Sequence, residues 1–76
     1  MITKKTHHDL PDYSFLVDRQ YFQFERFSHS VCLLTFGYYD ESGKLCYIYH
    51  TLINGNFTRR FTNYAMVLDY LRNFAQ

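Results

Sequence analysis

The sequence predicts a small α+β domain: an antiparallel meander of three to four strands with one C-terminal helix packed on one face. Three observations predict this class, namely two tight-turn signals in succession, strand-like runs around them, and an amphipathic segment at the C-terminal end. Residues 11–76 are expected to form one domain, because a chain of 76 residues supports a single core. Residues 1–10 are polar and without hydrophobic period, so we expect a flexible arm.

The first element of the domain has two interpretations. Pro11 fits the first position of a short N-terminal helix through residues 12–17. Residues 20–27 then alternate phenylalanine with polar side chains, which favours a strand. The competing interpretation is a single helix over residues 11–27, whose apolar side chains also share helical spacing. We prefer the strand, and the length of the turn at residues 28–30 decides its register.

Two hairpins follow this element. Residues 31–39 and 45–53 read as strands, and Gly43 stands in the loop between them where a short hairpin needs a left-handed backbone. Asn54-Gly55 is the dipeptide favoured in two-residue hairpin turns, and it folds residues 56–61 back as a further strand.

The hairpin register divides the sheet into two faces. If Asp40 opposes Lys44, even-numbered positions of the two long strands share one face, and the Asn54-Gly55 turn reverses the parity of the next strand. We expect the core on the face of Cys32, Leu34, Phe36, Tyr38, Cys46, Ile48, His50, Leu52, Phe57, Arg59 and Phe61. We expect an open surface on the face of Val31, Leu33, Thr35, Tyr39, Tyr47, Tyr49, Thr51, Thr58 and Arg60.

The last element is an amphipathic helix. Thr62 is a favourable N-cap, and Phe61 and Met66 have the spacing of a hydrophobic staple. Its apolar side chains recur at helical spacing: Tyr64, Val67, Leu68, Leu71, Phe74 and Ala75. We expect this helix to cover the even-numbered face, with Leu34 and Leu68 in the core.

Composition argues against several classes of function. The net charge of +1, from eight basic and seven acidic residues, does not indicate duplex DNA or an anionic membrane as partner. No apolar run is long enough to span a membrane, and residues 1–5 are not followed by the apolar stretch of a signal peptide. We therefore expect a cytoplasmic protein without a membrane partner.

No catalytic residue, metal site or cofactor is predicted. Cys32 and Cys46 lie several positions apart on the expected core face, beyond disulfide reach, and are expected to be reduced thiols. The histidines at positions 7, 8, 29 and 50 lack metal-site spacing. The carboxylates are scattered, and the chain has no phosphate-binding loop or nucleophile motif. We expect a non-enzymatic protein.

The aromatic content is the main indication of function. Eight Phe and eight Tyr are too many for a chain of this length to bury fully. Tyrosine and arginine are also enriched in interface hot spots. We therefore predict binding of a protein or nucleoprotein complex, or of a second copy as a homodimer. The candidate residues are Tyr39, Tyr47, Tyr49 and Arg60 at the centre, Leu33 beside them, and Arg59 or Arg72 at the rim.

Two alternatives stay open. The tyrosines with Arg60 also have the composition of a sheet that stacks single-stranded nucleic acid, but such a surface is normally distinctly basic. The layout is similar to that of a double-stranded-RNA-binding domain, except that residues 64–67 read Tyr-Ala-Met-Val where that family has a lysine-rich helix start. The second alternative is that residues 15–17 fold across the tyrosine face and cover it.

In size and layout, residues 31–74 resemble the small stand-alone α+β proteins with which phages and mobile elements block host machinery. Anti-CRISPR proteins are one such group, and bacterial immunity proteins are another. The resemblance implies a stoichiometric inhibitor or adaptor that acts on a larger protein or nucleoprotein complex. These groups share no diagnostic motif, so no functional residue is carried over from them.

Overall fold

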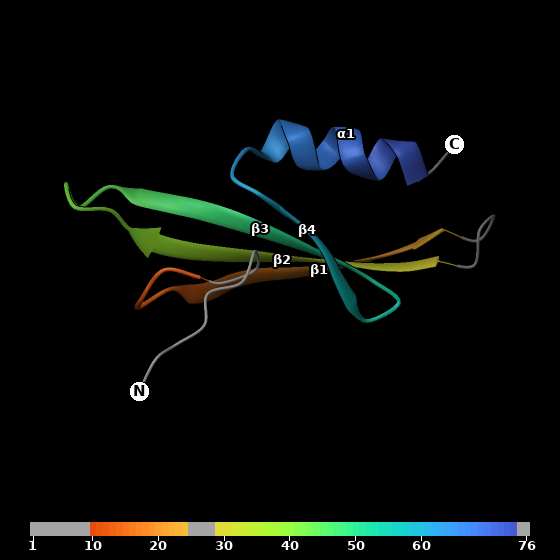
Figure 1. Ribbon diagram of the computed structural model, residues 1–76, viewed down its shortest axis with the longest axis horizontal. Helices are drawn as coiled ribbons and strands as arrows, with labels where there is room; N and C mark the ends of the chain where they lie inside the picture. The colour runs from red at the N-terminus through yellow and green to blue at the C-terminus, as the bar shows by residue number, and fades with distance from the viewer. Residues whose placement is uncertain (1–9, 25–28, 75–76) are drawn as a thin grey trace.

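The computed structural model describes residues 10–24 and 29–74, which form a curved sheet and one helix (Figure 1). The elements are β1 (Phe15–Phe24), β2 (His29–Tyr39), β3 (Leu45–Ile53), β4 (Asn56–Phe61) and α1 (Tyr64–Phe74). The strands are antiparallel in the order β1-β2-β3-β4, so β1 and β4 are the two edge strands. The predicted α+β meander with a C-terminal helix is confirmed.

The β2–β3 hairpin has the predicted register. Tyr39 pairs with Leu45, and the Asp40 N–H donates to the Lys44 carbonyl oxygen at 2.9 Å. Gly43 has a φ of +85°, a left-handed conformation that glycine adopts without a steric penalty. Hydrogen bonds to the Asp40 carboxylate, first from the Ser42 hydroxyl and then from the Lys44 N–H, lower the pKa of Asp40 and brace the loop.

The β3–β4 turn also forms at the predicted dipeptide. Asn54 and Gly55 have φ values of +52° and +86°, as a type I′ turn requires. Asn54 makes a second connection, because its N–H donates to the Ser30 carbonyl oxygen at 2.7 Å and its side-chain oxygen accepts from the Ser30 N–H at 3.0 Å. The turn is therefore tied to the start of β2.

The predicted N-terminal helix does not form within the described residues. Residues 11–14 make a turn in which the Ser14 N–H donates to the Pro11 carbonyl oxygen, with Tyr13 in the left-handed region at φ 62°. β1 then begins at Phe15, five residues before the predicted strand, so the alternative helix over residues 11–27 is also wrong. Cross-strand packing outweighs local helical spacing here. Of the arm predicted over residues 1–10, residues 1–9 lie outside the described residues. So do residues 25–28, which contain the end of the strand predicted over residues 20–27 and the first residue of the turn predicted at residues 28–30.

A β-bulge in β4 decides which face of the sheet carries the core. β3 pairs with β4 in one register as far as Phe57 and in another from Arg59 onwards, so Thr58 is an extra residue. The turn reverses the strand parity as predicted, but the bulge restores it after two residue pairs, Ile53 with Asn56 and Leu52 with Phe57. Phe61 consequently lies opposite Tyr49, on the odd-numbered face of β2 and β3.

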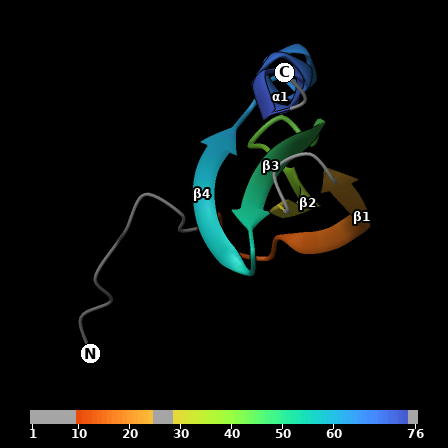
Figure 2. The same ribbon diagram turned by 90° about the vertical axis from the view of Figure 1, so that its right-hand side faces the viewer.

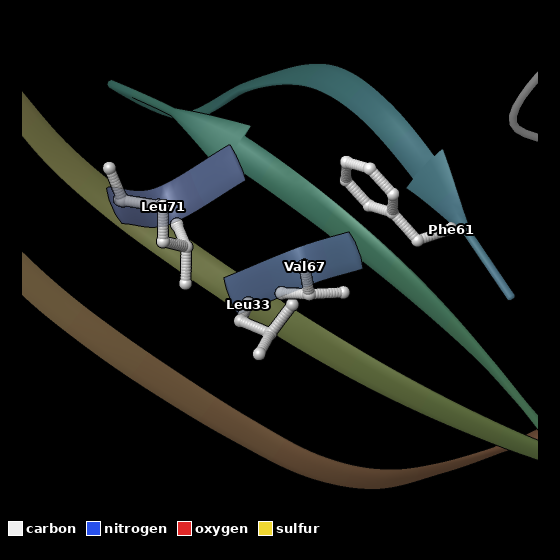
Figure 3. Close-up of a cluster of buried hydrophobic side chains, with 5 residues drawn as sticks. Leu33, Phe61, Val67 and Leu71 are labelled. Carbon is white, nitrogen blue, oxygen red and sulfur yellow. The ribbon is translucent and has the colours of Figure 1, made fainter. Parts of the chain in front are cut away.

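Helix α1 packs on this odd-numbered face, which we call the helix-bearing face. Its core consists of Val31, Leu33, Phe61, Val67 and Leu71, four of which are labelled in Figure 3. The partly buried side chains packed against this core are Phe22, Tyr49, Ile53 and Tyr70. The prediction that the helix covers the even-numbered face was therefore wrong. With Phe61 turned to the helix-bearing face, the chain leaves the sheet on that side and α1 follows (Figure 2).

Polar contacts fasten the helix to the bulge. The Tyr70 hydroxyl donates to the Thr58 hydroxyl oxygen at 3.1 Å. The Thr58 hydroxyl donates in turn to the carbonyl oxygen of Thr51, a residue with no exposed surface, at 3.0 Å. The bulged residue thus connects β3 to α1 as well as setting the direction of the chain.

The helix is capped by Asn63 and not by Thr62 as predicted. The Asn63 side-chain oxygen accepts from the Ala65 N–H at 2.8 Å, the usual N-cap hydrogen bond. β4 extends to Phe61, so Thr62 connects the strand to the helix, and Asn63 is the residue directly before α1. The predicted staple was also wrong, because Met66 is exposed and the Phe61 ring lies 5.3 Å from the Tyr70 ring instead.

The face opposite α1 has a smaller cluster of its own. Ile48 and His50 are buried there, although the helix lies on the other side of the sheet. The His50 ring lies between those of Phe36 and Phe57, with both centroid distances at 5.1 Å and edge-to-face geometry. The even-numbered face therefore holds some core, as predicted, but not the helix.

Leu33→Ala is expected to lower the free energy of unfolding by about 2–5 kcal/mol, because Leu33 is 1% exposed beneath α1. The matched change Leu68→Ala is expected to lower it by less than about 1 kcal/mol, since Leu68 is 42% exposed. Urea unfolding followed by circular dichroism measures both. Equal losses for the two variants would contradict this assignment of the core.

Candidate partner-binding surface

Helix α1 is too short to cover the face on which it packs. Its 11 residues span about 16 Å, whereas the 11 residues of β2 extend over about 36 Å. In Figure 1 the β2–β3 hairpin accordingly projects to the left beyond the start of the helix. The helix therefore leaves the hairpin end of the helix-bearing face uncovered. Of the tyrosines predicted on this face, Tyr39 and Tyr47 lie on the uncovered part, and Tyr49 lies beside the helix.

Exposed apolar side chains gather on this uncovered end. We call them the hairpin patch, which consists of Phe15, Val17, Tyr39, Leu45 and Tyr47. Their exposed fractions range from 37% for Leu45 to 65% for Tyr39. They come from three adjacent strands, so the patch is held by the sheet and not by a loop.

Gly37 forms the floor of the patch. It pairs with Phe15 on one side and with Tyr47 on the other. A Cβ at this position would lie 2.9 Å from the Phe15 ring and 3.0 Å from a Val17 methyl group, so both side chains lie directly over the glycine. The Phe15 ring is also 6.1 Å from the Tyr39 ring. The absence of a side chain at Gly37 thus allows the aromatic groups of neighbouring strands to meet.

A row of tyrosines joins the patch to the helix. The Tyr49 ring lies 5.5 Å from the ring of Tyr64, the first residue of α1. Burial, and after it the charges that Tyr47 and Tyr64 would carry on ionisation, raise the pKa of Tyr49. Tyr49 is therefore an uncharged phenol at neutral pH, half-buried between the patch and α1.

The predicted tyrosine surface is only partly open. Tyr39 and Tyr47 are exposed in the hairpin patch, as predicted. Leu33 is 1% exposed beneath α1, and Tyr49 is half-buried against Tyr64, so the prediction of an open face was wrong at these positions. The cause is again the bulge, which places the helix over this part of the face.

The predicted arginines are dispersed. Arg60 pairs with His50 and therefore lies on the face opposite α1, away from the tyrosines. Arg59 lies on the helix-bearing face, with its guanidinium 5.4 Å from the ring of Phe61. Arg72 is an exposed residue of α1, and its guanidinium is 3.4 Å from the Asp69 carboxylate. The predicted grouping of Arg60 with the tyrosines was wrong, because the bulge shifts β4 by one residue.

Sequence reasoning missed three members of the patch. Phe15 and Val17 were considered only as a cover for the tyrosines, and they do lie on that face, but they leave Tyr39 and Tyr47 exposed. Leu45 follows from the hairpin register, because it pairs with Tyr39. Gly37 was the available signal, since a glycine inside a strand often marks a close approach.

The described ranges 10–24 and 29–74 contain no cluster of three or more His, Cys, Asp or Glu able to hold a metal ion. Cys32 and Cys46 are free thiols. Over the same ranges, no helix has the length and apolar character to cross a membrane. No protein-family model, curated protein or solved structure matches the chain.

Gly37→Ala is expected to move the Phe15 ring out of the patch without disrupting β2. The new methyl group would meet the ring at 2.9 Å and a Val17 methyl group at 3.0 Å. The exposed ring can swing away, whereas the short Val17 side chain must shift with its backbone. We expect a loss of unfolding free energy of about 1–3 kcal/mol, together with loss of the nuclear Overhauser effects between the Phe15 and Tyr39 rings. Persistence of these ring contacts in the variant would contradict the role of the glycine.

Proposed function

We propose that the protein is a small non-enzymatic binding module that acts in the cytoplasm by occupying a surface of a larger protein or nucleoprotein complex. It would be a stoichiometric inhibitor or adaptor, such as those that phages and mobile elements direct at host machinery. The observation that supports this proposal is the hairpin patch, in which exposed apolar side chains converge on one end of the helix-bearing face.

The patch has the properties of an interface anchor. Phe15, Tyr39 and Tyr47 are 40–65% exposed, so a partner still has about half of each side chain to bury. Aromatic side chains present large area with few rotatable bonds, and their position on strands limits the entropy lost on binding. Burial of the remaining area contributes roughly 1 kcal/mol for each ring.

The patch does not suffice for a stable complex. Association costs an estimated 4–15 kcal/mol in translational and rotational freedom. Burial of the whole patch contributes only roughly 3–5 kcal/mol. A partner bound here must therefore also contact neighbouring parts of the helix-bearing face.

The distribution of charge favours a protein partner over single-stranded nucleic acid. Among the described residues, Arg19 and Arg60 are on the face opposite α1, and Lys44 is in the hairpin loop with two acidic residues. On the helix side, Arg59 lies over the rings of Phe61 and Tyr70, and Arg72 is paired with Asp69, so neither belongs to the patch. A surface that follows a phosphate backbone needs cations next to its stacking aromatics. The patch is aromatic and uncharged, which is typical of the centre of a protein interface.

The double variant Tyr39→Ser/Tyr47→Ser is expected to reduce partner capture by about tenfold or more, equivalent to 1.4 kcal/mol, while the fold is retained. The control is Leu16→Ser/Met66→Ser, which removes two comparably exposed side chains outside the patch. The immobilised protein is incubated with lysate, and the captured proteins and nucleic acids are quantified at 0.15 M and 0.5 M salt.

Salt-tolerant capture of a protein that only the tyrosine variant loses would support the proposal. Equal loss in both variants would contradict it, because the patch would then have no particular role. Capture of nucleic acid with a steep salt dependence would also contradict it. Analytical ultracentrifugation of the same variants identifies a second copy of the chain as the partner if wild type alone dimerises.

A further inference from the structure

A groove runs along the helix-bearing face of the sheet, between β1 and α1. It has a volume of about 710 Å³, and Tyr64 stands at the end nearer the hairpin patch. Its other lining residues are Gln20, Tyr21 and Phe22 of β1 and Leu68, Leu71 and Arg72 of α1. The groove is apolar for most of its length and open to solvent, with a cation on the helix side.

The groove follows a free edge of the sheet. β1 pairs with β2 on one side, and no strand among residues 10–24 and 29–74 pairs with its other side. In an edge strand every second backbone N–H and C=O points outward. β1 is regular from Asp18 to Phe24. Its protective features against further pairing, the bulge at Val17 and the charged residues Asp18 and Arg19, lie at the start of the strand, and residues 20–22 beside the groove have neither charge nor proline.

The apolar groove and the free edge of β1 together favour an extended peptide segment as the ligand. A strand added to the outer edge of β1 satisfies its outward backbone groups, as in β-augmentation. Such a strand projects alternate side chains toward the helix-bearing face, where Phe22 and Leu68 line the groove. A shallow open groove accommodates a chain better than it encloses a small molecule.

Arg72 adds a charge preference. Its ion pair with Asp69 is 3.4 Å long, and both side chains are about 70% exposed, so the pair is weak. An incoming carboxylate can therefore bind the guanidinium at the wall of the groove.

We propose that β1 and α1 bind an extended segment of a partner protein that has apolar residues at alternate positions and an acidic residue near Arg72. This inference rests on the proposed function and deepens it, because it names the kind of segment that is recognised. Tyr64 lines the groove and also contacts Tyr49 beside the hairpin patch, so the two surfaces adjoin. The groove thereby supplies the additional contact that the patch requires.

A second copy of the chain fits this groove less well. The register places Asp18, Gln20 and Phe22 of β1 on the helix-bearing face, opposite Thr35, Leu33 and Val31. If β1 of a second copy were the added strand, it would bring an aspartate and a glutamine to an apolar groove. A segment with apolar residues at each of these alternate positions is better matched to Leu68 and Leu71.

The test uses the full chain and a displayed library of random nonapeptides. The expected result is enrichment of peptides with apolar residues at alternate positions and one Asp or Glu. Leu68→Lys is expected to weaken binding of a selected peptide by tenfold or more, and Arg72→Gln to remove the acidic preference. Met66→Lys is the matched control, because Met66 is on the same helix, comparably exposed and outside the groove, and it should bind normally.

Peptide binding should also slow hydrogen exchange at the backbone amides of β1. The variant Tyr39→Ser/Tyr47→Ser should bind the selected peptide normally. The peptide experiment therefore tests the groove independently of the hairpin patch. Absence of enrichment, enrichment at helical spacing, or equal loss in Met66→Lys would overturn the proposal. A dimer of the wild-type chain that Leu68→Lys abolishes would overturn it as well, because the groove would then belong to a second copy.

Discussion

The extra residue in β4, Thr58, determines the arrangement of the whole molecule. Because side chains alternate along a strand, one inserted residue moves every later side chain of β4 to the other face. Phe61 thereby turns to the helix-bearing face, and α1 follows it there. The hydroxyl of Thr58 then fixes this outcome by joining the backbone of Thr51 to the side chain of Tyr70. A single residue sets both the direction of the chain and the attachment of the helix.

The candidate surfaces follow from where the helix lies and how short it is. With α1 on the helix-bearing face, Leu33 and part of Tyr49 are covered, while Tyr39 and Tyr47 lie beyond its reach. The same placement leaves a groove between α1 and the free edge of β1. The hairpin patch and this groove adjoin at Tyr64, so a partner can use an aromatic anchor and an added strand together.

Local signals in the sequence predicted the two hairpins and the C-terminal helix, since Gly43 and Asn54-Gly55 specify turns through their own backbone conformations. The sequence around Thr58 has no such signal, because threonine and arginine are tolerated on either face, and the face assignment therefore failed. β1 depends on a distant residue, since Phe15 and Val17 lie over Gly37. Tyr39 and Tyr47 were correctly placed as exposed because their positions depend only on the β2–β3 register, whereas Arg60 was misplaced because it follows the bulge.

The hairpin patch and the groove both depend on the packing of α1 against the odd-numbered residues of β2 and β3. Nuclear Overhauser effects between methyl groups of a selectively labelled sample test it directly. The structure predicts strong effects between Val67 and Leu33, which share one buried cluster, and none between Val67 and Ile48. Strong effects from Val67 to Ile48 or Leu34 would place the helix on the other face. The bulge, the hairpin patch and the groove would then all be wrongly assigned.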